Sequence, residues 1–275
     1  MMKGLGFLVK GESTAMDLGL TGRVAIVTGG SEGIGRAIAL RLAEEGVDVA
    51  ICARRTDVLE AAAADIAKQT RRHVLAVPAD VTNPADLERF VHTATNRFGR
   101  LDIVVNNAGH SNARAFDDVS DEVWQSDLDL KFFAAIRTAR LALPHLRRSD
   151  AGRIINIVMV GGKQPGAHSV PTSVSRAAGI AFTKALSKDL ASDGITVNAV
   201  CVGTIKSAQH ERTWKREGRP ETLEGWYAER GKNIPLGRVG EAEEVGDLVA
   251  FLASNRAAYI TGTAINIDGG VSGAV

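Results

Sequence analysis

Hydrophobic residues follow two different patterns along the chain. Short runs rich in Val and Ile are apolar on both faces, and the longer stretches between them have apolar residues at every third or fourth position. The short runs are typical of strands buried between helical layers in a parallel sheet, and the longer stretches of amphipathic helices. The predicted strands are 24–28, 47–53, 73–77, 101–105, 153–160, 195–200 and 263–267, and the predicted helices are 34–46, 58–69, 84–99, 122–146, 172–194 and 241–254.

The order of these elements predicts the fold class. Strands that alternate with helices through the whole chain indicate an α/β fold with a doubly wound, seven-stranded parallel sheet and helices on both faces. No internal repeat or linker interrupts the alternation, so we expect one Rossmann-fold domain over residues 20–275. Residues 1–19 are expected to form a poorly ordered N-terminal extension, and no function is assigned to residues 1–15.

One irregular stretch, 203–238, breaks the alternation late in the chain. It is rich in charge, contains Trp214, Trp226 and Tyr227, and follows a predicted strand. Ligands of such sheets bind beyond the carboxyl ends of the strands, so an insertion there is in place to cover a substrate. We interpret the stretch as a substrate lid, and a solvated surface excursion is the alternative.

The composition of the chain excludes some classes of binding partner and indicates a cellular compartment. The 33 basic and 32 acidic side chains give a net charge of +1, which argues against a nucleic-acid-binding protein. No apolar stretch approaches the roughly 18 residues that a membrane helix needs, so no membrane association is expected. Both cysteines, Cys52 and Cys201, lie in strand-like runs without a disulfide framework, which favours a reducing, cytoplasmic compartment. The histidines show no metal-ligand spacing, so no metal site is predicted. The expected partner is a small-molecule substrate.

A glycine-rich loop follows the first predicted strand and leads directly into a helix. Glycines at 29, 33 and 35 allow a tight turn, close approach of the backbone to a pyrophosphate, and packing of the helix on the sheet. The free N–H groups at the start of that helix then point at the phosphates. The strand–loop–helix context predicts a dinucleotide site. The predicted cofactor contacts in this loop are Gly29, Ser31, Gly33, Ile34 and Gly35.

The end of the second predicted strand bears on the choice of cofactor. NAD sites usually place an acidic residue there for the ribose 2′-hydroxyl, but this chain has Ala53 followed by Arg54 and Arg55. Arginine can pair with a 2′-phosphate through two hydrogen bonds, so we expect NADP(H) in preference to NAD(H). Glu32 in the glycine-rich loop opposes this prediction because it adds a negative charge. Arginines solvated at a strand end are the alternative.

These residues, together with further motifs in the same order, resemble the classical short-chain dehydrogenase/reductase family over roughly residues 20–272. The resemblance implies that Asp80 and Val81 contact the adenine. It also implies that the segment CVGTIKS (201–207) lies beside the nicotinamide, with Val202 where the family has proline. The segments IPLGR (234–238) and YITGTAINIDGG (259–270) match the C-terminal signature of the family. The remaining cofactor residues that it implies are Asn107, Ala108 and Gly109 from the NNAG motif, Gly203, Ile205 and Arg176.

The catalytic residues of the family are not kept. The family uses Asn, Ser, Tyr and Lys, the last two spaced Tyr-x-x-x-Lys. Neither tyrosine of this chain is followed by Lys at the fourth position. A small subset of the family resembles this chain in its Leu-Lys-Phe-Phe run (130–133) and its Thr-Ser-x-x-Arg run (172–176). At the four catalytic positions the chain has Lys131 for Asn, Met159 after Val158 for Ser, Thr172 for Tyr and Arg176 for Lys.

We hypothesise that Lys131 and Arg176 approach each other near the nicotinamide. A neighbouring guanidinium would lower the lysine pKa from about 10.4, which makes Lys131 a plausible proton donor, and both cations would stabilise an alkoxide. Thr172 keeps a hydroxyl that can donate a hydrogen bond. His168, four residues before Thr172, is a second candidate acid. The alternative for Lys131 is a side chain that extends to solvent from an interfacial helix.

The predicted function is that of an NADP(H)-dependent oxidoreductase that interconverts a carbonyl and an alcohol at an atypical centre of Lys131, Thr172 and Arg176. A catalytically silent NADP-binding sensor or partner subunit is the alternative, and an enoyl-type reductase a third possibility, which the lack of a suitable tyrosine disfavours. The resemblance also implies a homotetramer or homodimer, joined through the helices 122–146 and 172–194. The two lid tryptophans favour a bulky or apolar substrate.

Overall fold

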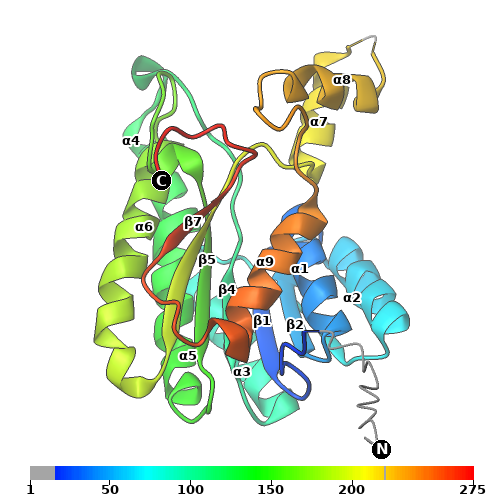
Figure 1. The fold of residues 1–275 in the computed structure, drawn as a ribbon, viewed down its shortest axis with the longest axis vertical. Coiled ribbons are helices and arrows are strands. Elements are labelled where there is room, and N and C mark those ends of the chain that lie inside the picture. The colour runs from blue at the N-terminus through cyan, green and yellow to red at the C-terminus, as the bar shows by residue number, and fades with distance from the viewer. Residues whose placement is uncertain (1–15, 220) are drawn as a thin grey trace, which may run out of the picture.

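Seven parallel strands form one sheet at the centre of the protein (Figure 1). The computed structural model describes residues 16–219 and 221–275. The strand order is β3-β2-β1-β4-β5-β6-β7, so the order reverses between β1 and β4. Each predicted strand is confirmed, with ends that differ by at most two residues. The strands are β1 (Val24–Thr28), β2 (Asp48–Ala53), β3 (Val74–Pro78), β4 (Ile103–Asn106), β5 (Arg153–Met159), β6 (Thr196–Val202) and β7 (Ala264–Ile267).

Helices connect the strands, and the predicted helices are also confirmed. The stretch predicted as one helix over 122–146 contains a π-helical segment, Asp129–Phe133, between two α-helices. The α-helices are α1 (Gly33–Glu44), α2 (Thr56–Thr70), α3 (Pro84–Phe98), α4 (Asp121–Leu128), α5 (Ala134–Leu146), α6 (Thr172–Asp189), α7 (Ala208–Glu217), α8 (Leu223–Gly231) and α9 (Ala242–Ala253).

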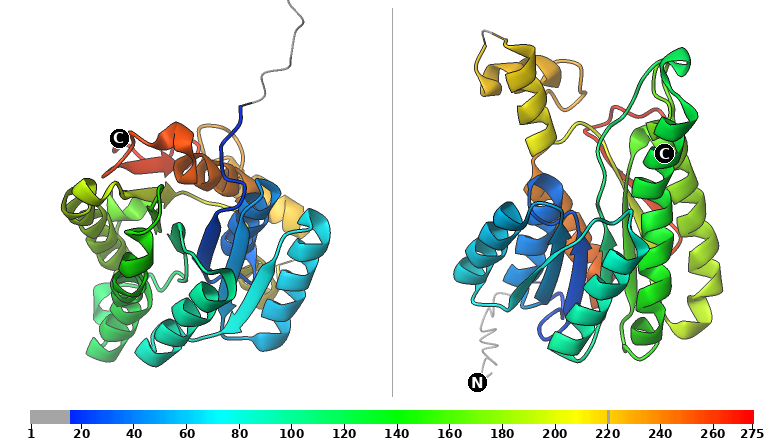
Figure 2. Two further views of the ribbon diagram at one scale, coloured as in Figure 1. Left: turned by 90° about the horizontal axis from the view of Figure 1, so that it is seen from below. Right: turned by 180° about the vertical axis from the view of Figure 1, so that it is seen from behind.

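Two helical layers cover the sheet, one on each face (Figure 2). Neighbouring residues of β2 show why, because Val49 and Ile51 pack with α1, α2 and α9, whereas Ala50 and Cys52 face α3 and α5. All four side chains are fully buried. Because strands buried on both faces have apolar residues at every position, the continuous hydrophobic runs of the sequence correspond to this three-layer arrangement.

The irregular stretch predicted over 203–238 contains two helices that sequence reasoning missed. Helices α7 and α8 rise beyond the carboxyl edge of the sheet (Figure 1). Ser207 and Thr222 cap their N-termini, where each side chain accepts a hydrogen bond from a backbone N–H in the first turn. The two ends of the stretch are joined at its base, since Lys206 N donates to Gly240 O (2.9 Å) and Gly240 N to Thr204 O (3.0 Å).

The predicted start of the domain at residue 20 is a few residues too late. The backbone oxygen of Asp17 accepts a hydrogen bond from Arg256 Nε (2.8 Å), and that of Leu18 accepts one from Asn255 N (3.3 Å). The Leu18 side chain also packs against the core on the α1–α9 side. Residues 17–19 are therefore part of the packed domain. The prediction made for residues 1–15 lies outside the described residues.

Two further properties concern the described part of the chain. Over residues 16–219 and 221–275, no helix is long and apolar enough to cross a membrane. In the same residues no cluster of three or more His, Cys, Asp or Glu side chains is suited to hold a metal ion. Both cysteine thiols are buried and unbridged, and burial raises the pKa of Cys52 to about 12 and that of Cys201 to about 11. Neither thiol is therefore ionised near neutral pH.

Candidate active site

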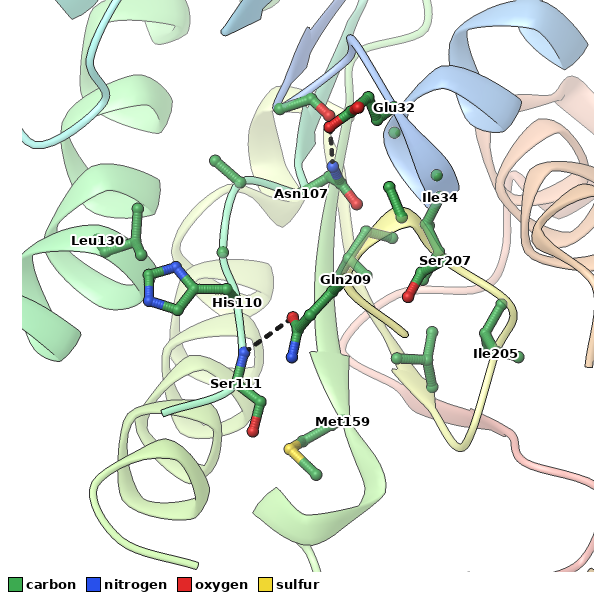
Figure 3. A pocket seen from close by; sticks show the side chains of 18 of the residues that line it. Glu32, Ile34, Asn107, His110, Ser111, Leu130, Met159, Ile205, Ser207 and Gln209 are labelled. Atoms are coloured by element: carbon green, nitrogen blue, oxygen red, sulfur yellow. Dashed lines mark hydrogen bonds between the residues drawn. The ribbon is translucent and has the colours of Figure 1, made fainter. Parts of the chain in front are cut away.

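A cavity of about 1290 Å³ opens at the carboxyl edge of the sheet (Figure 3). It lies where β1 and β4 are neighbours and the strand order reverses, the place at which sheets of this kind bind ligands. Residues at the ends of β1 to β6 and the start of α7 line it. Every residue that the sequence predicts as a cofactor contact, from Gly29 to Ile205, is among the lining residues.

The glycine-rich loop lines the cavity, and two of its positions require glycine. Gly29 has a φ of +68°, and a β-carbon at Gly35 would lie only 2.1 Å from the backbone oxygen of Gly29. Asn107 fixes the loop from β4, since its Nδ2 donates to the backbone oxygens of Thr28 (3.0 Å) and Gly29 (3.2 Å). Helix α1 begins without a side-chain cap, so its first N–H groups are free to face a phosphate.

The other end of the cavity carries the residues predicted to surround the adenosine. Asp80 and Val81 line it beyond β3, and Arg54 and Arg55 line it beyond β2. Glu32, the residue that opposed the NADP(H) prediction, is not a free negative charge. It forms ion pairs with Arg55 and with Arg212 of α7. The balance of charge at this end therefore remains positive.

Lys131 is buried, so the alternative in which its side chain extends to solvent is wrong. The side chains of Lys131 and of Asp127, one helical turn earlier, are 0% and 1% exposed. Lys131 Nζ donates to Asp127 Oδ1 and to Thr172 Oγ1, the latter at 3.0 Å. The second oxygen of Asp127 accepts a hydrogen bond from Ser175 Oγ (2.7 Å). The lysine is thus fixed between α4 and α6 by a charged partner and a hydroxyl.

The pKa of Lys131 is lowered from 10.5 to about 8. Burial is the main cause, because it penalises the ammonium form. The hydrogen bond to Asp127 opposes this effect, and the charge of Arg176 adds to it. Sequence reasoning predicted that the pKa of Lys131 is lowered, but it attributed this shift to the guanidinium of Arg176. In the structure, burial is the larger cause and Arg176 a smaller one.

Arg176 lines the cavity, and it lies close enough to Lys131 for its charge to lower the lysine pKa. A β-carbon at Gly109 would lie 2.5 Å from Arg176 Nη2 and 3.4 Å from Lys131 Cγ, so glycine at this position lets both cations come together. Arg176 Nη1 donates to the backbone oxygen of Ile157 (2.9 Å), which fixes the guanidinium at the end of β5. Burial lowers the pKa of Arg176 to about 10, so it stays a cation near neutral pH.

Thr172 stands between Lys131 and the cavity. It is the first residue of α6 and a lining residue, whereas Lys131 is not. Thr172 Oγ1 accepts hydrogen bonds from Lys131 Nζ and from the backbone N–H of Asn112 (2.8 Å). A hydroxyl has two acceptor positions and one proton, so both acceptor positions are filled and the proton remains available to donate. The sequence placed Lys131 itself in the pocket, and the structure instead places it behind Thr172.

The other predicted residues divide into two groups. Met159 lines the cavity at the end of β5 and replaces a hydrogen-bond donor with a thioether (Figure 3). His168 does not line the cavity. It is exposed in the loop before α6 with a φ of +55°, so the prediction of His168 as an acid at this site is wrong. Neither tyrosine lines the cavity: Tyr259 is fully exposed, and Tyr227 is buried in α8.

Asp127 and His110 are among the site residues that sequence reasoning missed. Asp127 lies four positions before Lys131, a spacing that places the two side chains on one face of a helix, so their pairing was readable from the sequence. His110 follows the NNAG motif directly and lines the cavity beside Leu130 (Figure 3). Partial burial lowers the pKa of its imidazole, and the charge of Lys131 lowers it further.

Comparisons with known proteins agree over nearly the whole chain. A family model described as enoyl-(acyl carrier protein) reductase matches residues 29–272. The chain is 39% identical over 258 residues to the ketoacyl reductase assigned to the monensin polyketide synthase of Streptomyces virginiae, which covers 91% of this chain and 97% of that protein.

Solved structures with the same fold include two NADPH complexes. The L-sorbose reductase of Gluconobacter frateurii, complexed with NADPH and L-sorbose, has a TM-score of 0.91 and 33% identity, over 94% of this chain and all of that one. An NADPH-bound short-chain oxidoreductase from Pseudomonas aeruginosa, described as containing an atypical catalytic center, has a TM-score of 0.86 and 34% identity, over 92% of this chain and 98% of that one.

The position of Lys131 predicts its titration. In protein with isotope-labelled lysine, the NMR signal of the Lys131 side chain should titrate with a midpoint near pH 8. Arg176→Met should move the midpoint upward because it removes a nearby positive charge, whereas Arg176→Lys should move it less. A midpoint near 10.4 in the parent protein, the usual value for lysine, would contradict the burial and pairing described here.

Proposed function

The chain belongs to the classical short-chain dehydrogenase/reductase family, and we propose that it is an NADP(H)-dependent oxidoreductase that interconverts a ketone and a secondary alcohol. One observation carries the proposal. The Thr172 hydroxyl lines the cavity with both acceptor positions filled, by Lys131 Nζ and Asn112 N, so its proton can be donated to a substrate oxygen. A hydroxyl backed by an ammonium group of lowered pKa is a suitable proton source for a reduction.

The residues of the cavity fit a bound NADP(H). The glycine-rich loop and the start of α1 would hold the pyrophosphate, Asp80 and Val81 the adenine, and Gly203 and Ile205 the nicotinamide side. Arg54 and Arg55 supply charge for a 2′-phosphate. The NADPH complexes of the L-sorbose reductase and of the Pseudomonas oxidoreductase support the preference for NADP(H). The cofactor supplies or accepts a hydride, and the protein handles the accompanying proton.

Proton transfer in the reducing direction would run through two residues. As the substrate carbon receives a hydride, its oxygen becomes an alkoxide and takes the Thr172 proton. Thr172 Oγ1 in turn takes a proton from Lys131 Nζ, 3.0 Å away, which leaves the lysine neutral until it is protonated again. Arg176 stays cationic and stabilises the developing negative charge, because its guanidinium lines the same cavity. In the oxidising direction the same protons move in reverse.

Asp127 and Ser175 would act on Lys131 rather than on the substrate. The Asp127 side chain is 1% exposed and does not line the cavity. Asp127 would therefore affect the reaction only through its contact with Lys131. Its carboxylate holds Nζ toward Thr172 and raises the lysine pKa against the effect of burial. Ser175 holds the carboxylate in turn. This arrangement would keep the ammonium charged enough to act as an acid near neutral pH.

Two further expectations are part of the same proposal. Helices α7 and α8 would form a substrate lid. Gln209 of α7 already reaches across the cavity, where its Oε1 accepts a hydrogen bond from the backbone N–H of Ser111 (3.1 Å, Figure 3). The protein would assemble as a homodimer or homotetramer through the helices over 122–146 and through α6, where Phe133 of the π-helical segment and Val174 of α6 are exposed.

Single-turnover measurements test the reaction. Parent protein mixed with NADPH should transfer hydride to at least one member of a panel of ketones and 3-oxoacyl thioesters. Thr172→Val and Lys131→Met should each lower the rate by about 100- to 10,000-fold, the usual effect of losing an acid–base group. Thr172→Ser keeps the hydroxyl and should retain much more activity than Thr172→Val. NADPH binding without transfer to any member would favour the alternative, an NADP-binding sensor or partner subunit.

The pH dependence of ketone reduction gives a second test. Reduction needs the ammonium form of Lys131, so its rate should fall as the pH rises through about 8. Asp127→Asn removes a carboxylate that raises this pKa, so the fall should move to lower pH. Lys131→Met should lose the fall altogether. A profile identical in Lys131→Met and the parent would rule out the lysine as the group that titrates.

A further inference from the structure

Glu32 joins two arginines that are far apart in the sequence. It lies in the glycine-rich loop, and its carboxylate pairs with Arg55, just beyond β2, and with Arg212 Nη1 of α7 (3.1 Å). All three side chains line the cavity at its adenosine end, and Arg54 and Arg216 line it as well. A single glutamate therefore connects the phosphate loop, the end of β2 and the proposed lid.

The charges at this end do not balance. Four arginines, Arg54, Arg55, Arg212 and Arg216, line the cavity here, and the acidic side chains that line it are Glu32 and Asp80. The Asp80 carboxylate is turned to its own loop, where Oδ1 accepts hydrogen bonds from the backbone and hydroxyl of Thr82. Glu32 and its two partners are a third or more exposed. Exposed ion pairs of this kind are weak, so a ligand of higher negative charge can replace the carboxylate.

The place of this cluster identifies the ligand group. In dinucleotide-binding sheets, the residues at the end of the second strand meet the adenosine ribose at its 2′ position. A 2′-phosphate there carries up to two negative charges and three acceptor oxygens, which suits guanidinium groups better than one carboxylate does. Helix α7 is already close, because a β-carbon at Gly33 would lie 3.6 Å from both Ser207 Cβ and Ala208 N.

We propose that Arg212 is a cofactor-specificity residue that α7 contributes from the lid. Without cofactor it pairs with Glu32, and on binding it exchanges this partner for the 2′-phosphate of NADP(H). In the free protein, the carboxylate of Glu32 thus occupies the position on Arg212 that the phosphate takes in the complex. A 2′-phosphate offers more negative charge and more acceptor oxygens than Glu32, so it holds α7 against the adenosine end more firmly, and the lid distinguishes NADP(H) from NAD(H). This inference rests on the NADP(H) preference proposed above.

Calorimetric titration with 2′,5′-ADP and with ADP tests the inference without any turnover. Arg212→Gln should weaken binding of 2′,5′-ADP about tenfold, the scale of one charge-assisted hydrogen bond near solvent, and leave ADP binding within about twofold. Lys215→Gln is the matched control, because Lys215 is exposed on the same helix and does not line the cavity. It should bind both ligands as the parent does. Equal thermal midpoints for the three proteins would show that folding is unaffected.

Glu32→Gln tests the exchange itself. It frees Arg55 and Arg212 and removes a negative charge beside the phosphate, so 2′,5′-ADP should bind severalfold more tightly. In the Arg212→Gln background this gain should be smaller, because one of the two freed arginines is gone. Weaker binding in Glu32→Gln would mean that the carboxylate orients the arginines, and it would overturn the exchange.

The outcomes separate this inference from the proposal on which it rests. A parent protein that binds 2′,5′-ADP no better than ADP would refute the NADP(H) preference itself. A parent that prefers 2′,5′-ADP, together with an Arg212→Gln variant that binds like Lys215→Gln, would leave that preference standing and refute the role of Arg212. Amide hydrogen exchange adds a further check, since 2′,5′-ADP should protect α7 in the parent and not in Arg212→Gln.

Discussion

The buried ion pair between Lys131 and Asp127 is the interaction on which the site depends. Both side chains are almost completely removed from solvent, and a charge in such a place is costly unless it is paired and hydrogen-bonded. The pair meets this condition with Thr172 and Ser175, both from α6. The same contacts join α4 to α6, oppose the lowering of the lysine pKa by burial, and direct the ammonium at the hydroxyl of Thr172, a residue that lines the cavity. The local packing of α4 against α6 and the chemistry of the site therefore depend on the same four side chains.

The two ends of the cavity use charge in different ways. At the Lys131 end, burial makes each charge costly and fixes its geometry, which suits proton transfer at a defined atom. At the Glu32 end the ion pairs are partly exposed, so little free energy is lost when a charged ligand replaces one partner. This suits recognition of a charged ligand that enters from solvent. The parallel sheet brings the two ends together, because the loops after β1, β2, β4 and β5 all leave at its carboxyl edge.

The sequence predicted what depends on local pattern and missed what depends on the fold. The seven strands could be predicted because burial on both faces requires apolar residues at every position of a strand. The cofactor loop could be predicted because its tight turn and close contacts require glycine. Helix α7 was missed because half of its residues are charged and its cap, Ser207, is a weak signal. The Arg176–Ile157 contact and the Glu32–Arg212 pair join distant parts of the chain, so only the fold reveals them. His168 was misplaced because its position in a loop does not determine whether it faces the cavity.

The central claim is that the proton of the reduction comes from Lys131 through Thr172. The solvent deuterium isotope effect on single-turnover hydride transfer tests it most directly, because it reports whether a proton moves in the same step. If the proton comes from Lys131 through Thr172, heavy water should clearly slow the parent protein and only slightly slow the residual rate in Lys131→Met or Thr172→Val. An isotope effect of the same size in all three proteins would show that the proton comes from another source, and would contradict the account.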